Sequence, residues 1–135
     1  MTSAYSATPL ARKLSLKDGM RAWRDGMPES VATRIAAEGL KLRLLDKLDP
    51  PIDAAHIFVT SSGELGAKLH ELLPLLSPAG QIWVSWPKKA SKVPTDITED
   101  VIRDVALPMR LVDVKVCSVD DVWSGLKLVI RREHR

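Results

Sequence analysis

A short apolar strand that runs directly into a capped helix constrains the fold of this chain more than any other feature. Residues 57–59 are a continuous apolar run, the pattern of a strand that helices cover on both faces. Just after it, Ser61 and Glu64 form a capping box, which satisfies free backbone N–H groups at a helix start. A strand that ends where a helix begins predicts one unit of an α/β protein.

The same succession of strand and helix recurs along the chain. At residues 40–44 leucines alternate with Lys41 and Arg43, which predicts a half-exposed strand. The helix that follows Glu64 must kink or end at Pro74, because proline cannot donate to the carbonyl four residues back. In chain order we expect a helix at 8–14, a strand at 20–23, a helix from residue 29 and a strand at 40–44. The strand at 57–59 and its helix follow. A strand at 81–86 and a helix from residue 97, which Pro108 ends, come next.

The last part of the chain predicts two paired strands. Residues 111–119 and 126–132 have strand patterns, and residues 120–125 between them are too few to hold a crossover helix, so the strands form an antiparallel hairpin. Right-handed crossovers place the earlier helices on both faces of a parallel sheet. We therefore expect an α/β fold: a Rossmann-like three-layer sandwich, with a mainly parallel sheet that closes with a C-terminal antiparallel hairpin, in a single domain over residues 1–135.

Length and composition are ordinary for a folded globular protein. The chain has 135 residues, of which 45% are hydrophobic and 27% charged. Its longest apolar runs are only strand length, so we expect no membrane partner. Residues 1–13 lack the apolar region of a secretion signal, and Cys117, the only cysteine, allows no intramolecular disulfide. These features favour a soluble protein of the cytoplasm.

Three polar segments follow predicted strands, at residues 24–26, 60–62 and 85–96. They are expected to converge, because ligands of parallel sheets bind beyond the carboxyl ends of the strands. The lysines of the third segment precede a helix start, where ammonium and backbone N–H groups can face one anion. Alternatively, Asp96, Glu99 and Asp100 pair with these lysines in an exposed loop. The predicted ligand-binding residues are Arg24, Ser61, Ser62, Trp86, Lys88, Lys89, Lys92 and Thr95.

Other chemistries find few residues. Ser61 and Ser62 lack a nucleophile elbow, and His56, on an apolar strand, is most simply a satisfied core or surface residue. Three histidines and one cysteine give no metal-ligand spacing, so no metal site is predicted. Trp83 and Trp86 lie three apart on one strand and should therefore point to opposite faces of the sheet.

The layout from residue 57 onward resembles the second half of a class I methyltransferase domain. The similar features are the apolar strand, a leucine-rich helix that ends at residues 72–80, the strand at 81–86, a further helix and the closing hairpin. This resemblance implies a Rossmann-like sheet. The family's cofactor loop is glycine-rich, whereas residues 23–28 offer only Gly26, and Asp46 alone stands where a ribose-binding acid is expected. We therefore expect no cofactor, and in particular no S-adenosylmethionine.

The chain also resembles, over nearly its whole length, a small bacterial family known only as a domain of unknown function. The matching motifs are Tyr-Ser-Ala-Thr-Pro-Leu-Ala at residues 5–11, Trp-Val-Ser-Trp-Pro-Lys-Lys at 83–89, Val-Pro-Thr-Asp at 93–96, and the segments at 116–120 and 123–125. This resemblance implies the fold and a cytoplasmic setting, without an assigned reaction.

These observations favour a non-catalytic, methyltransferase-like module that binds a small anionic ligand or a protein partner. One alternative is an enzyme acting on an anionic substrate, with Lys88 or Lys89 as electrostatic clamp and Asp96 as general base. The other is a weak nucleic-acid binder, because a net charge of +3 and three groups of basic residues can neutralise phosphates. No zinc-finger spacing or aromatic RNA platform accompanies that charge, so nucleic acid is not the expected main partner.

Overall fold

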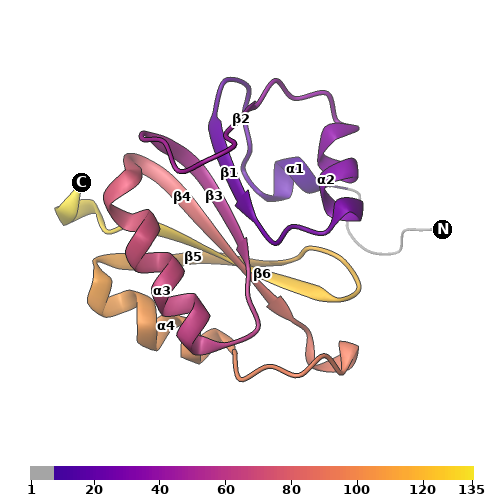
Figure 1. Cartoon of the computed structure of the whole chain (residues 1–135), viewed down its shortest axis with the longest axis vertical. Helices are drawn as coiled ribbons and strands as arrows, with labels where there is room; N and C mark the ends of the chain where they lie inside the picture. The colour runs from indigo at the N-terminus through magenta and orange to yellow at the C-terminus, as the bar shows by residue number, and fades with distance from the viewer. Residues whose placement is uncertain (1–7) are drawn as a thin grey trace.

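Alternating apolar strands and capped helices assemble into one six-stranded sheet in the computed structural model, which describes residues 8–135 (Figure 1). The strand order is β2-β1-β3-β4-β6-β5. Strands β2, β1, β3 and β4 are parallel to one another, and β6 is antiparallel to both β4 and β5. The expected mainly parallel sheet with a C-terminal antiparallel hairpin is confirmed. The strands are β1 (Arg21–Asp25), β2 (Arg43–Leu44), β3 (Ile52–Phe58), β4 (Leu76–Pro87), β5 (Leu111–Ser118) and β6 (Trp123–Ile130).

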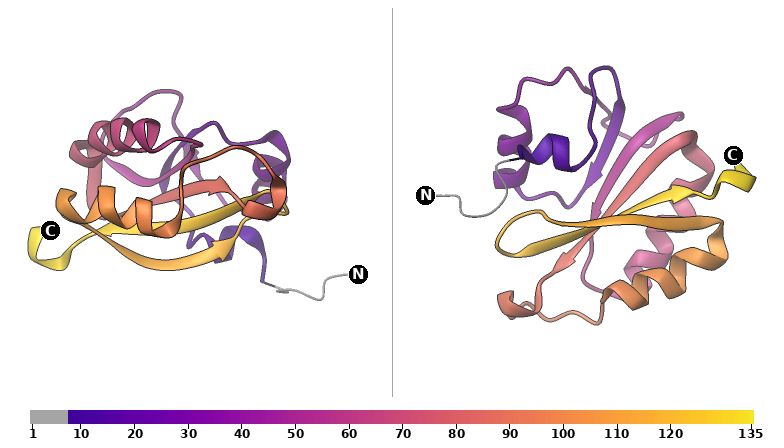
Figure 2. Two further views of the ribbon diagram at one scale, coloured as in Figure 1. Left: turned by 90° about the horizontal axis from the view of Figure 1, so that it is seen from below. Right: turned by 180° about the vertical axis from the view of Figure 1, so that it is seen from behind.

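Helices cover both faces of this sheet, as Figure 2 shows. Helices α1 (Leu10–Lys13) and α2 (Glu29–Ala36) lie on one face, and α3 (Ser62–Leu72) and α4 (Glu99–Ala106) on the other. The motif at residues 5–7 lies outside the described residues. Short 3-10 turns complete the chain at Leu73–Leu75, Lys89–Ser91, Leu107–Met109 and Arg132–His134.

The core has two layers, one on each side of the sheet. Leu65, Leu69 and Ile102 of α3 and α4 pack on one face, and the smaller layer lies beneath α1 and α2. Trp83 belongs to the layer beneath α1 and α2 whereas Trp86 belongs to the other, as their odd spacing on one strand predicts. Residues 54–59 are all buried, which confirms that helices cover this strand on both faces.

Local signals set most helix ends. The Ser61 hydroxyl accepts a hydrogen bond from the Glu64 backbone N–H at 3.2 Å, so the predicted cap is present. The Glu64 carboxylate accepts a hydrogen bond from the Thr60 backbone N–H. In a complete capping box the donor would be the next residue, Ser61. Helix α3 ends at Leu72, two residues before Pro74, and a 3-10 turn follows.

Strand lengths differ from the expectation, because pairing with neighbours decides them. Strand β3 begins at Ile52 and β4 at Leu76, each five residues earlier than the apolar runs suggest. Strand β2 keeps only two residues of the predicted strand at 40–44, and both are exposed. Helix α4 begins at Glu99 after the N-cap Thr98, two residues later than the start expected at residue 97, so Asp96 lies before the helix.

Candidate functional site

The parallel strands β1, β3 and β4 all end at the same side of the sheet, which we call the carboxyl edge. The loops that follow these three strands therefore lie together there. Strand order reverses between β1 and β3, because β2 lies on one side of β1 and β3 on the other. This is the position at which Rossmann-like sheets bind ligands. Since β6 is antiparallel to β4, the tip of the β5–β6 hairpin joins the same edge, with Trp123 opposite Pro87.

The loop after β4 is docked on the start of α3. Asp96 accepts hydrogen bonds from the Ser62 backbone N–H at 2.8 Å and from the Ser62 hydroxyl at 2.9 Å. The Thr95 hydroxyl donates to the Thr60 carbonyl at 2.7 Å. A carboxylate at a helix N-terminus makes the contacts that a bound anion would make there. The chain's own Asp96 therefore occupies the anion position of α3.

The crevice between β1 and β3 is also filled by the protein's own groups. Asp25, the last residue of β1, forms an ion pair with Lys68 of α3, and this contact raises the pKa of Lys68. Gly26 has a φ of +71°, and a Cβ atom at that position would lie 3.2 Å from the Phe58 carbonyl oxygen. The loop after β1 thus packs directly against the end of β3.

His56 lies inside the sheet and not at its edge. It is 6% exposed, shares a hydrogen bond of 2.7 Å with the Ser85 hydroxyl and stacks on Phe58. Burial, with a smaller contribution from the nearby Arg24 charge, lowers the pKa of His56 to about 3. His56 is therefore a neutral, satisfied core residue, which confirms the simpler interpretation of the sequence.

Arg24 points toward the α2 side of the sheet. Its Nη1 donates to the Met27 sulfur at 3.3 Å, and partial burial lowers the pKa of its guanidinium group. Together with His56 and Trp83 it lines a small pocket of about 20 Å³, which has room for about one water molecule.

The lysines of the loop after β4 remain without acidic partners in the described part of the chain. Lys88 donates to the Ser118 hydroxyl at 2.7 Å, and Lys89 and Lys92 are exposed. The alternative in which nearby acids pair with them is wrong. Glu99 and Asp100 bind Arg103 of α4, as does Asp113 of β5, while Asp96 caps α3.

The predicted ligand-binding residues thus divide into two groups. Ser61, Ser62 and Thr95 cap or dock neighbouring backbone, Trp86 is 8% exposed within the core, and Arg24 lies toward the other face. Only Lys88, Lys89 and Lys92 present charge outward from the edge. Sequence reasoning missed Lys68 and Ser118, which no local pattern marks, because their partners lie on other elements.

The strand order, the helices on both faces and the closing hairpin define this domain as one with the class I methyltransferase fold. The search of solved structures supports this: a S-adenosylmethionine-dependent methyltransferase from Aquifex aeolicus matches with a TM-score of 0.61 and 16% identity over 90% of this chain and 87% of that one. A methyltransferase from Pyrococcus furiosus gives a TM-score of 0.56 with 14% identity over 90% of this chain and 80% of that one.

Magnesium protoporphyrin IX methyltransferase from Synechocystis, determined with bound S-adenosylmethionine, also gives a TM-score of 0.56, with 11% identity over 89% of this chain and 74% of that one. These likenesses establish the fold alone. No protein-family model matches the sequence, and no curated protein matches it.

The residues present do not fit S-adenosylmethionine, the cofactor that this fold implies. The loop after β1 has one glycine and packs on Phe58, and Asp25 is paired with Lys68. Strand β2 pairs with β1 only as far as Ala22, so no strand holds the exposed Asp46 beside the end of β1.

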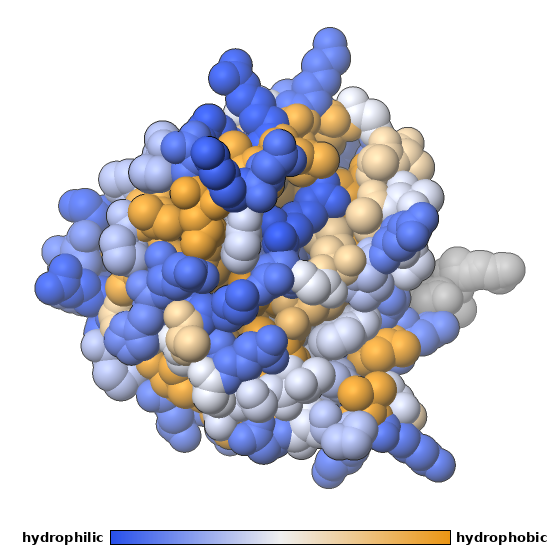
Figure 3. Space-filling model, in the orientation of Figure 1, coloured by the Kyte–Doolittle hydropathy of each residue, from blue (hydrophilic) through white to orange (hydrophobic). Residues whose placement is uncertain are grey.

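In residues 8–135, no group of three or more His, Cys, Asp and Glu side chains is placed to hold a metal ion. Within the same residues, every helix is too short or too polar to cross a bilayer. On the side of the molecule drawn in Figure 3, apolar side chains form several separate groups between charged ones.

Proposed function

We propose that this protein is a non-catalytic, methyltransferase-like domain of the cytoplasm that binds a small anionic ligand as a regulatory module. The observation that carries the proposal is the contrast at the carboxyl edge of the sheet. Its cofactor crevice is filled by the protein's own groups, whereas Lys88, Lys89 and Lys92 have no acidic partner among the described residues. Membership of the small bacterial family of unknown function is part of this proposal.

The ligand is expected to be a phosphate or a similar compact anion. Ammonium groups act as mobile point charges and need no fixed bidentate geometry, so they suit phosphate oxygens. Lys92 has a φ of +61°, which turns the chain sharply after the 3-10 turn at Lys89–Ser91. The three lysines therefore lie on one tight turn that the Ser91 hydroxyl stabilises by donating to the Lys88 carbonyl at 2.6 Å.

Thermal denaturation with pyrophosphate and, separately, with saturating S-adenosylmethionine tests this proposal. Pyrophosphate at about a hundred times its Kd should stabilise the fold by about 2.7 kcal/mol, which raises Tm by several degrees for a domain of this size. The triple variant Lys88→Ala, Lys89→Ala, Lys92→Ala should lose that rise. A control that replaces Arg43 and Lys47, which are exposed at and just after the outermost strand β2, should keep the rise in Tm.

Two results would reject the proposal. A rise of several degrees with S-adenosylmethionine would show that the crevice opens for a cofactor. An equal pyrophosphate response in the triple variant and the control would show that the anion binds elsewhere. If no compact anion shifts Tm, the anionic-ligand proposal fails and a protein partner at the carboxyl edge is the alternative. Crosslinking from Lys89 in cells would identify that partner.

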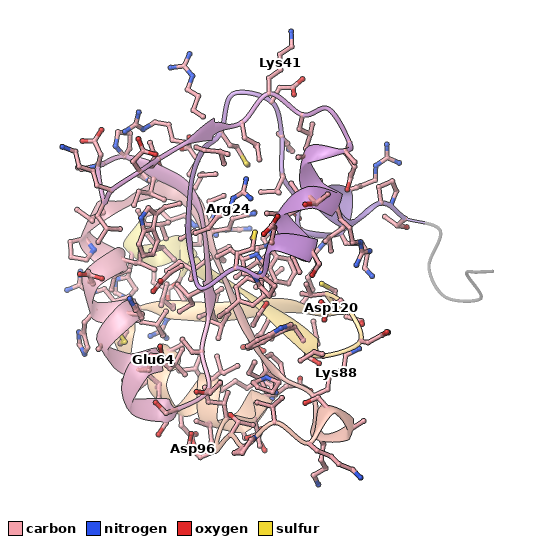
Figure 4. The ribbon with its side chains drawn as sticks, turned by 45° about the vertical axis from the view of Figure 1, so that its right-hand side comes forward. Arg24, Lys41, Glu64, Lys88, Asp96 and Asp120 are labelled. Carbon is pink, nitrogen blue, oxygen red and sulfur yellow. The ribbon has the colours of Figure 1, made fainter. Side chains whose placement is uncertain are left out.

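The enzyme alternative loses support from the geometry. Lys88 lies beside the hairpin tip and Asp96 beside the start of α3, well apart in Figure 4. Both oxygens of Asp96 already accept hydrogen bonds from Ser62. A clamp and a general base must face one substrate, and these two residues are committed to different neighbours.

A further inference from the structure

One face of the β5–β6 hairpin is only partly covered by helices in residues 8–135. Near the tip, Cys117 and Trp123 pack against the core layer beneath α1 and α2, whereas farther along Lys115 is exposed and Lys127 is half-buried. Figure 2, in the view from behind, shows this hairpin crossing the front of the molecule beside α1 and α2.

Leu126 and Leu128 point to the core on the α3 and α4 side, so the alternate residue Lys127 points to the opposite face, which we call the open face. Lys115 of β5 lies on that face as well, with its ammonium group 6.0 Å from the centroid of the Trp83 ring.

Lysines from four separate segments surround this open face. The charges of Lys13, Lys115 and Lys88 all act on the Cys117 thiol, whose pKa burial raises. Burial and the neighbouring charges of Lys115 and Lys17 lower the pKa of Lys127. Geometry agrees with these charge effects, because Lys115 lies opposite Lys127, Lys17 and Lys127 line one groove, and Lys88 donates to Ser118 of β5. We call these lysines, with Lys13, the hairpin lysines: Lys13, Lys17, Lys88, Lys115 and Lys127.

Acidic side chains of the described residues form no ion pair with the hairpin lysines. Asp18 and Glu38 lie nearby, but they accept hydrogen bonds from the backbone N–H groups of Lys41 and Ala11. Asp120 accepts from two N–H groups of its own turn, and residues 1–7 contain no acid. Asp121, exposed at the hairpin tip, is the remaining acid of this end.

A groove of about 920 Å³ continues the open face toward α1. Three basic residues, Arg12, Lys17 and Lys127, line it together with two acids, Asp18 and Glu38. The Lys127 ammonium group donates to the Ser15 hydroxyl at 3.2 Å. Basic groups thus lie at the hairpin tip (Lys88), on the sheet (Lys115 and Lys127) and along the groove (Lys17 and Arg12). They come from four separate segments, which suits an extended ligand better than one compact anion.

We propose that the open face of the β5–β6 hairpin, with this groove, binds the phosphate backbone of a nucleic acid without sequence preference. A nucleic acid supplies the regularly spaced negative charges that an extended set of lysines can neutralise. Base stacking is not part of the proposal, because Trp83 is 1% exposed and the half-buried Trp123 packs edge-on against Phe58. The exposed large apolar side chains of the hairpin are Val114 and Val116 of β5. Val116 lies opposite Leu126 and therefore on the other face, so the open face offers little for insertion into lipid and an anionic membrane fits less well.

This surface is distinct from the carboxyl-edge loop, although Lys88 touches both. Lys115→Glu with Lys127→Glu reverses two charges on the open face and leaves Lys89 and Lys92 in place. The control is Arg43→Glu with Lys47→Glu, the same change of charge at the exposed β2 edge. Circular dichroism and Tm establish that each variant folds, and Lys17→Glu alone replaces the double variant if that one does not.

Fluorescence anisotropy with a labelled single-stranded RNA of about 20 nucleotides measures the affinity. If all five lysines meet phosphates, affinity should fall about a hundredfold between 50 and 200 mM salt, at about 0.7 released counterions per contact. The open-face variant should bind at least tenfold more weakly than wild type, and the β2-edge control within about twofold. The open-face variant should also keep the pyrophosphate response, so the two proposals fail separately.

Four outcomes would overturn the inference. The first is an RNA affinity that does not change with salt, and the second is an equal loss of RNA affinity in the open-face variant and the control. The third is tighter binding to polyglutamate than to RNA, and the fourth is tighter binding to phosphatidylserine vesicles than to RNA. The third would assign the face to an acidic protein and the fourth to a membrane surface. Duplex DNA of the same length, tested in parallel, distinguishes a single-stranded from a double-stranded partner.

Discussion

Acidification should destabilise this protein through one buried histidine, His56. The folded protein keeps His56 neutral, with a pKa of about 3, whereas the unfolded chain protonates it near pH 6.5. Protons therefore favour the unfolded state below pH 6.5, and the contribution is complete above that pH and lost progressively toward pH 3. Each pH unit within this range costs about 1.4 kcal/mol, so lowering the pH from 7 to 5 should remove about 2 kcal/mol of stability.

Urea denaturation at pH 7, 6 and 5 measures this loss, and His56→Gln provides the comparison. The glutamine variant will be less stable at every pH because it loses stacking on Phe58 and part of the contact with Ser85. Its free energy of unfolding should nevertheless change about 2 kcal/mol less than that of wild type between pH 7 and pH 5. His70→Gln, at an exposed position of α3, should retain the wild-type dependence on pH. A wild-type stability that stays flat over this range would refute the reasoning.

The Asp96 cap and the turn at Gly26 give two further predictions, each measured by urea denaturation. Asp96→Ala should cost about 1 kcal/mol, because it removes the side chain that caps α3, while Asp104→Ala, exposed on α4, should stay within about 0.5 kcal/mol of wild type. Equal effects would contradict the role of Asp96 as a cap. Gly26→Ala should cost about 1–2 kcal/mol, because its φ is +71° and its new Cβ would meet the Phe58 carbonyl. Gly63→Ala has open space in a helix and should not destabilise, so a loss there comparable to that at Gly26 would reject this explanation.

The filled crevice explains how a methyltransferase-like fold can be present without a place for the cofactor. Cofactor binding in such sheets requires a backbone that passes close to the ligand and a free helix start. Here Gly26 brings the backbone close to Phe58 instead, and Asp96 satisfies the start of α3. The loop after β1 and the start of α3 are thus both held by contacts within the chain.

The sequence predicted the candidate site only in part. The convergence of the three polar segments followed from strand order, and the basic loop after β4 is at the expected edge. The partners of its charged residues could not be predicted. Asp96 binds Ser62, which is 34 residues away, and Glu99 and Asp100 bind Arg103 rather than the lysines. A carboxylate finds the donor that the fold places nearest, and sequence distance says little about which donor that is.

The chain by itself determined the features that depend on a few neighbouring residues. The cap at Ser61, the end of α3 before Pro74 and the antiparallel hairpin all follow from hydrogen bonds and steric limits within one turn or one short connection. These interactions are available to any chain with this local sequence, so local reasoning identifies them.

Only the tertiary structure decided what happens between segments. The two-residue length of β2, the cap that Asp96 gives to α3, and the gathering of Lys13, Lys88 and Lys115 around Cys117 all depend on which strands become neighbours. Those neighbours are set by the crossovers and by burial of the whole sheet, which no short window of sequence contains. The sequence therefore located a basic loop, and the fold disclosed a second and larger basic surface on the hairpin.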